Sequence, residues 1–222
     1  MKDPYVDENN VLINKLNINS YEKLNQAEAD ICFVNLMKID SIDINCFDEN
    51  LIKKIHKFIF DDIFDWAGEY RTVPLYKEEV VIPGLSLNYT NYNKIEEELK
   101  NKINELNSIS WSDMSIKDIS FIFARKLAII WKIHPFRDGN TRTILSFAFL
   151  YAREHSFPFD MVTFTNELSR KYNSNGNISA YSVRDKFVLA SLDDNDSPEV
   201  GHLAYIFEKA ISNYSNNIKR KI

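Results

Sequence analysis

The stretch of sequence that decides the fold is His134-Pro135-Phe136-Arg137-Asp138-Gly139-Asn140-Thr141-Arg142. It separates the most apolar segment of the chain, residues 115–133, from a second apolar segment with helical spacing, residues 141–155. Pro135 predicts the end of the first helix, because the residue before a proline is disfavoured in the α region. Gly139 accepts unusual backbone angles. The stretch therefore predicts a loop that connects two central helices.

The side chains of this loop suggest chemistry on a phosphate. A loop that leads into a helix N-terminus favours an anion, because free backbone N–H groups and the helix dipole attract negative charge. Arg142 would add a fixed positive charge in the first turn. Asp138 is the only carboxylate of the loop, and a lone carboxylate suits Mg²⁺, which keeps waters and shares phosphate oxygens. His134 is the only residue of the loop that can move a proton at neutral pH.

Composition excludes several classes of protein. The 222 residues are 45% hydrophobic with only 5 Gly and 6 Pro, which favours one sizeable core over a turn-rich β-sandwich. A net charge of -5 argues against a protein that coats nucleic acid. Cys32 and Cys46 are too few for a disulfide framework. Since neither a signal peptide nor a membrane-length apolar run is visible, we expect a cytoplasmic protein that binds neither membrane nor nucleic acid directly.

Apolar residues at helical spacing dominate the rest of the chain. The expected helices cover residues 51–63, 91–109, 115–133, 141–155, 159–172 and 179–192, with a last helix at about 197–217. The segment 72–84 differs, because β-branched residues and turn residues predict a short hairpin or flap with Tyr76 to Glu79 near its turn. We find no repeat and no flexible linker. The sequence thus predicts a single, mostly helical domain over residues 1–222, with its core at about 51–192.

Seven positions of the loop resemble the signature of the Fic family, His-Pro-Phe-x-(Asp/Glu)-Gly-Asn-(Gly/Lys)-Arg. The matching residues are His134, Pro135, Phe136, Asp138, Gly139, Asn140 and Arg142. Residues 55–60 followed by 65–71, Asp-Trp-Ala-Gly-Glu-Tyr-Arg, are similar to the family's helix, WAG-type turn and flap. Asp3-Pro4-Tyr5 resembles the start of short bacterial Fic toxins, and the resemblance covers most of the chain.

The resemblance implies an all-α Fic fold, a helical bundle around a central helix–loop–helix motif with a short β-hairpin flap. It also implies a protein adenylyltransferase, which moves AMP from ATP to a Tyr, Ser or Thr hydroxyl and releases pyrophosphate. His134 would deprotonate the target hydroxyl, and Asp138 would hold Mg²⁺. The nucleotide phosphates would be bound by Gly139, Asn140, Thr141 and Arg142. Phe136 would anchor the loop in the core. The flap would align the target by strand-like main-chain pairing through Tyr76, Lys77, Glu78 and Glu79.

The chain departs from the family pattern in two ways. One concerns the residues that bind the triphosphate tail, and the other concerns self-inhibition of the protein. Leu145 stands where relatives often carry a second arginine, and Thr141 replaces the usual Gly or Lys. Relatives also often carry an inhibitory helix with the pattern (Ser/Thr)-x-x-x-Glu-(Gly/Asn). The segment 212–217 has that spacing, but Asn216 occupies the glutamate position. We therefore expect no self-inhibition through that pair, and a separate small antitoxin or no inhibitor instead.

Other functions remain open at this level. One is a Doc-like kinase, which binds the nucleotide in the inverted orientation and transfers phosphate. The Doc-like motif usually lacks a glycine after the acidic position, whereas this chain has Gly139 there. Another is transfer of a different phosphate-linked moiety, such as UMP or phosphocholine. A third is an inactive Fic scaffold that only binds a partner. The target is named only by analogy, as a type II topoisomerase or a small GTPase. Self-modification on a tyrosine is a further alternative.

Overall fold

The computed structural model of this 222-residue chain describes residues 3–77, 79, 81–82, 87–168, 172–173, 179–180, 182–192 and 199–219. Within those residues the fold is helical, with two 3₁₀ turns and one short pair of strands. The α-helices are α1 (Tyr21–Leu36), α2 (Glu49–Phe60), α3 (Ile95–Asn107), α4 (Ile116–Ile133), α5 (Asn140–Glu154), α6 (Met161–Leu168), α7 (Val183–Ala190) and α8 (Val200–Lys219). The all-α fold that the sequence predicts is confirmed.

Side-chain caps set where three of these helices begin. The Asp48 carboxylate accepts the N–H of Leu51 at 2.9 Å and starts α2. Ser115 accepts the N–H of Asp118 at 3.2 Å and starts α4, as its position before the apolar segment predicts. Ser182 starts α7 with a reciprocal capping box. Local sequence therefore fixes these starts before any packing is considered.

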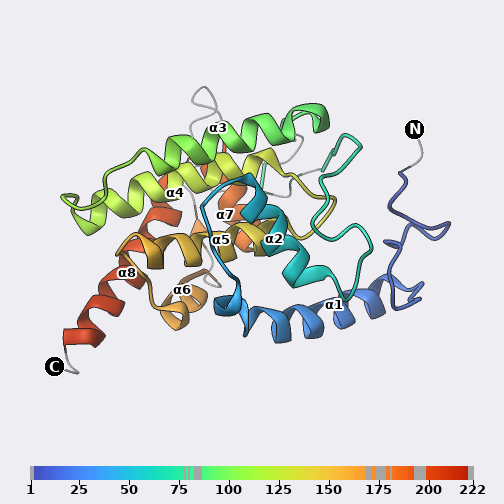
Figure 1. Cartoon of the computed structure of the whole chain (residues 1–222), viewed down its shortest axis with the longest axis horizontal. Coiled ribbons are helices and arrows are strands. Elements are labelled where there is room, and N and C mark those ends of the chain that lie inside the picture. Colours follow the sequence, from blue (N-terminus) through green and yellow to red (C-terminus); the bar gives the residue numbers. More distant parts are fainter. Residues whose placement is uncertain are drawn as a thin grey trace.

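Helices α4 and α5 lie at the centre of the molecule (Figure 1). Helices α3, α7 and α8 pack against α4, and α2 packs against α5. In the core, the ring of Phe123 on α4 lies 5.7 Å from that of Tyr151 on α5 and 5.2 Å from that of Phe207 on α8. Phe123 is fully buried, which contributes about 1.5–3 kcal/mol relative to an exposed side chain. The core thus holds rigidly the two helices that carry the motif loop.

Several expected boundaries in the second half of the chain are wrong. The helix expected at 159–172 is shorter and ends at Leu168, because Tyr172–Asn173 (β1) pairs in antiparallel fashion with Ser179–Ala180 (β2). The helix expected at 179–192 begins only at Val183, because Ser182 caps it. The last helix is described from Val200 to Lys219, and residues 197 and 198 lie outside the described part of the chain.

Two features of the first half also differ from the expectation. Helix α1 is not predicted, because only Leu24, Glu28 and Cys32 of its 16 residues are buried and the apolar period is weak. The flap, residues 72–84, contains no strand among the residues that the structure describes there, which are 72–77, 79, 81 and 82. The N–H of Ile82 donates to the carbonyl of Glu79 at 3.2 Å, which forms a turn.

In the described residues we find no helix whose length and apolarity together would suffice to cross a bilayer.

Candidate active site

The motif loop has the helix–loop–helix geometry that the sequence predicts. Helix α4 ends at Ile133, and His134 follows in the left-handed region with φ 51° and ψ 61°. Gly139, with φ 75°, precedes the first residue of α5, Asn140. Phe136 is fully buried, which confirms its expected role as the anchor of the loop. The free N–H groups at the start of α5 therefore lie beside His134 at the same short loop.

Asn140 closes the loop rather than facing outward. Its side chain is 3% exposed, its Oδ1 accepts the N–H of Phe136 at 2.9 Å, and its Nδ2 donates to the carbonyl of Phe136 at 2.9 Å. Because both ends of the amide are used within the loop, the phosphate role that the sequence suggests for Asn140 falls to its backbone N–H.

Arg71 holds the motif loop from a distant part of the sequence. It is 2% exposed, and its Nε donates to the carbonyl of His134 at 2.8 Å. Its Nη1 donates to Val73, its Nη2 to Thr90, and its backbone N–H to the carbonyl of Pro135 at 2.9 Å. Burial lowers the pKa of Arg71 to about 10, so the side chain stays charged at neutral pH. Sequence reasoning noted Arg71 only as part of the WAG-type segment and missed this role.

Replacing Arg71 with methionine is expected to destabilise the protein by about 3–5 kcal/mol, because several buried carbonyl groups lose their charged donor. Urea denaturation of the purified variant measures this loss. Arg153→Met is the matched control, since Arg153 forms a surface ion pair with Asp40 and its removal should cost less than about 1 kcal/mol. Equal losses for the two variants would contradict a special role for Arg71.

His134 has the tautomer and the protonation state of a base. Its side chain is 1% exposed, and Nδ1 lies 3.3 Å from the carbonyl oxygen of Trp131, so Nδ1 carries the proton and donates it. The lone pair is then on Nε2, which has no hydrogen-bond partner among the described residues. Burial lowers the pKa of His134 well below its ordinary value, and the positive charges of Lys77 and Arg184 lower it further. The imidazole is therefore neutral at pH 7.

His56 connects the WAG-type turn to the motif loop. Its Nδ1 accepts the N–H of Gly68 at 2.8 Å, so Nε2 carries the proton and donates to the carbonyl of Asp138 at 3.1 Å. Its ring stacks on Phe136 with 3.8 Å between centroids. Burial lowers the pKa of His56 to about 3. His56 therefore has a structural role, which includes fixing the backbone of Asp138.

Arg142 is held on the side of the loop that faces α1. It forms an ion pair with Glu28, its Nη1 donates to the sulfur of Cys32 at 3.2 Å, and its guanidinium lies 4.6 Å from the ring centroid of Phe60. Burial raises the pKa of Glu28, although Arg142 opposes the shift. Sequence reasoning missed Glu28, because 114 residues separate it from Arg142.

Asp138 is the carboxylate of the motif loop that would ligate a magnesium ion if one binds there. Its Oδ1 accepts the N–H of Gly139 at 2.6 Å. Among the described residues there is no group of three or more His, Cys, Asp or Glu side chains that would hold a metal. One carboxylate at a helix N-terminus therefore fits Mg²⁺ that is held jointly with nucleotide phosphates, and it does not fit a full protein cage.

The four expected flap residues have different surroundings. Tyr76 is 79% exposed, whereas Lys77 is half-buried, and burial lowers its pKa. Glu78 lies outside the described residues. Glu79 is only 3% exposed, accepts a hydrogen bond from the Tyr89 hydroxyl at 2.7 Å and forms an ion pair with Arg184. The side chain of Glu79 is thus used inside the protein, and Tyr76 is at the surface.

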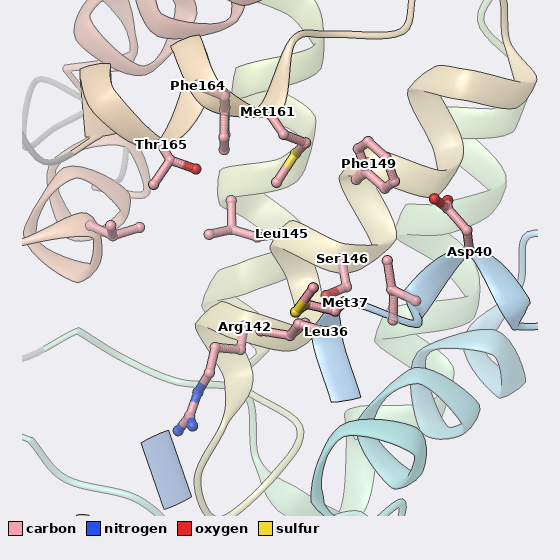
Figure 2. Close-up of a pocket in the computed structure, with 12 residues that line it drawn as sticks. Leu36, Met37, Asp40, Arg142, Leu145, Ser146, Phe149, Met161, Phe164 and Thr165 are labelled. Carbon is pink, nitrogen blue, oxygen red and sulfur yellow. The ribbon is translucent and has the colours of Figure 1, made fainter. Parts of the chain in front are cut away.

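Beside the motif, a cavity of about 490 Å³ opens between α1, α5 and α6 (Figure 2). Leu145 forms part of its wall, at the position where relatives often carry the second arginine, and the guanidinium of Arg142 points away from the apolar centre. The wall consists of Leu36, Met37, Ile39, Asp40, Arg142, Leu145, Ser146, Phe149, Met161, Phe164, Thr165 and Val183. Among these lining residues the only cation is Arg142, so none of them replaces the missing arginine.

The first described residues pack against the motif loop and the start of the flap. Both Nε and Nη2 of Arg137 contact Oδ2 of Asp3, at 2.8 Å and 2.7 Å. The ring of Tyr5 meets that of Trp66 edge-on at 5.6 Å, and the Tyr5 hydroxyl accepts the N–H of Thr72 at 3.1 Å. Arg137 therefore forms an ion pair with Asp3, which lies 134 positions away in the sequence.

Comparison with known proteins gives concordant matches. Residues 46–152 match the family model described as Fic/DOC family. The chain is 28% identical over 161 residues to protein adenylyltransferase VbhT of Bartonella schoenbuchensis, a match that covers 71% of this chain and 32% of VbhT. The match therefore leaves about two thirds of VbhT without a counterpart in this chain.

Solved structures share the fold. The N-terminal Fic domain of the Bep8 effector from Bartonella sp. 1-1C superposes with a TM-score of 0.71 at 22% identity, covering 93% of both chains. The N-terminal Fic domain of a putative cell filamentation protein from Bartonella quintana, with bound ADP, gives 0.71 at 20% identity and 93% coverage of both. The fold of this chain is thus that of these solved Fic domains, and residues 46–152 match the Fic/DOC family model.

Proposed function

We propose that this protein is an adenylyltransferase that transfers AMP from ATP to a hydroxyl group of a target protein and releases pyrophosphate. The observation that carries the proposal is His134, a buried neutral imidazole with its lone pair on Nε2, beside the N-terminus of α5. The name of VbhT and the ADP bound to the Bartonella quintana domain support the same reaction class.

In the proposed reaction, Nε2 of His134 takes the proton of the target hydroxyl as its oxygen attacks the α-phosphorus. The bond from the α-phosphorus to the bridging oxygen breaks, and pyrophosphate leaves. The backbone N–H groups of the first turn of α5 stabilise the charge on the α-phosphate, whereas the N–H of Gly139 donates to Oδ1 of Asp138. Asp138 would hold Mg²⁺, which when bound offsets phosphate charge. Arg142, which pairs with Glu28, would offset the charge on the departing pyrophosphate.

The pH dependence of transfer follows from the surroundings of His134. A general base must be unprotonated, and burial together with Lys77 and Arg184 lowers the pKa of His134 well below 6.5. Lowering this pKa moves the loss of activity to lower pH. We therefore expect kcat/KM to stay nearly constant from pH 8 down past pH 6.5, and to fall only in more acidic solution. Rates in constant-ionic-strength buffers measure this, and a midpoint at or above 6.5 would contradict the assignment.

ATP labelled at the α- or the γ-phosphate separates the proposed reaction from its alternatives. Incubation with Mg²⁺ and cell lysate should label protein from α-labelled ATP only, because the γ-phosphate departs with pyrophosphate. Retention of the γ-label would identify a kinase, and no label from either would fit an inactive scaffold or a different donor such as UTP. The size of the labelled band distinguishes a topoisomerase, a small GTPase and the chain itself as target. Addition of a candidate antitoxin to the same assay tests for an inhibitory partner.

A further inference from the structure

Three polar side chains from distant segments meet beside His134. The Glu79 carboxylate accepts a hydrogen bond from the Tyr89 hydroxyl at 2.7 Å and pairs with the guanidinium of Arg184 on α7. Arg184 also donates to the Tyr89 hydroxyl at 2.6 Å. Each member therefore contacts the other two, and we call this group the Glu79–Tyr89–Arg184 triangle. Glu79 is 3% exposed, so the triangle is built into the protein and is not a surface ion pair.

The triangle reaches His134 through two aromatic rings. The ring of Tyr89 lies 4.3 Å from the imidazole at an angle of 30°, and the ring of Trp131 meets the imidazole edge-on at 4.9 Å. Arg184 contacts both of these rings. It donates to the hydroxyl of Tyr89, and its guanidinium lies 5.4 Å from the centroid of Trp131. The rings that limit the rotation of His134 are thus both held by one side chain.

Glu79 explains why a cation is tolerated at this place. The carboxylate of Glu79 is 3% exposed and pairs with Arg184, whose side chain is 28% exposed, so neither charge is left without a partner. The charge of Arg184 is still felt by the imidazole: it helps to lower the pKa of His134, together with burial, Lys77 and Arg71. Arg184 thus has a geometric and an electrostatic connection to the proposed base.

We infer that Arg184 is a positioning residue for the transfer reaction, which holds Tyr89 and Trp131 against His134 and so fixes the direction of Nε2. The inference rests on the proposed role of His134 as base. Arg184 itself need not touch the substrate. A misplacement of a base by about 1 Å costs roughly 100-fold in rate. Loss of Arg184 should therefore lower kcat and leave the binding of ATP nearly unchanged.

The test compares Arg184→Gln, Arg184→Lys, Tyr89→Phe and the double variant Glu79→Gln with Arg184→Gln. We expect Arg184→Gln to lower kcat about 10- to 100-fold while the KM for ATP changes less than about 3-fold. Arg184→Lys should restore part of the rate. The double variant guards against a folding defect, because it removes both charges of the pair together and leaves the buried Glu79 position neutral. It should be more stable than Arg184→Gln and equally slow. Arg153→Gln serves as a surface control.

A readout independent of turnover separates this inference from the proposed function. Nuclear magnetic resonance of ¹⁵N-labelled histidine reports the tautomer and the pKa of His134 in the wild type and in the double variant. We expect the Nδ1–H tautomer in the wild type, and in the double variant a mixture of tautomers, since Tyr89 and Trp131 lose the guanidinium that holds them against the imidazole. If wild type transfers no AMP but these spectra change as expected, the proposed function fails and the positioning role stands. An unchanged tautomer in the double variant would overturn the inference, as would a kcat equal to wild type.

Discussion

His134→Ala is expected to reduce the labelling of protein from α-labelled ATP by about 10²- to 10⁴-fold, because the target hydroxyl loses its general base. The backbone N–H groups at the start of α5 remain, so binding of nucleotide should persist. Labelling with purified enzyme, Mg²⁺ and lysate measures the first effect, and calorimetric titration with a non-hydrolysable ATP analogue measures the second.

A second histidine provides the matched control. His155 follows α5, where its ring stacks on Tyr151 at 3.7 Å and its Nδ1 lies 2.8 Å from the carbonyl oxygen of the same residue. His155→Ala should lower the melting temperature and keep the transfer rate per folded molecule. If His134→Ala labels protein as fast as His155→Ala does, the base has been assigned to the wrong residue.

Gly139→Ala is expected to destabilise the protein by about 2–4 kcal/mol and to abolish transfer. A Cβ at this position would lie 2.4 Å from ring atoms of Phe60, and φ is +75°, where an L-residue is strained. Phe60 is itself 1% exposed, so its ring has little space into which to move. The loop must then shift away from the geometry that places His134 beside the start of α5. Urea denaturation and the labelling assay measure the two effects.

Gly201 in α8 is the control for this substitution. A Cβ there meets nothing within 4 Å. Gly201→Ala should therefore be neutral or stabilising by up to about 1 kcal/mol, since alanine is the better helix former. We therefore expect the free energy of unfolding to fall in Gly139→Ala and to stay equal or rise in Gly201→Ala. A stable, active Gly139→Ala variant would show that the loop tolerates a different path.

Local sequence predicts the helix–loop–helix motif well, because its determinants are close together in the chain. Pro135 ends one helix, Gly139 supplies a positive φ, and Ser115 caps the start of α4. The periodic spacing of the apolar residues in α4 and α5 also predicts which face of each helix packs against the core. These are short-range rules of backbone geometry, and nothing distant in the chain overrides them here.

The partners of the motif are not predictable in this way. Arg71 donates to His134 across 63 positions, and Arg184 pairs with Glu79 across 105. No local pattern marks these pairs, since each depends on how separate helices pack. Glu79 illustrates the error: near an expected turn it looks like a surface residue, but its tertiary partner places it inside. Glu28 escaped notice because α1 exposes most of its residues and lacks a clear apolar face.

The contacts of Asp3 and Tyr5 with the motif loop have a practical consequence for anyone who labels this protein. Because Asp3 holds Arg137 and Tyr5 contacts both Trp66 and Thr72, a tag or fluorophore fused just ahead of residue 3 would lie next to the motif loop. The far end of α8 lies on the opposite side of the molecule (Figure 1). Fusions made after α8 are therefore expected to avoid the motif loop, and a pull-down of the proposed target should use that end.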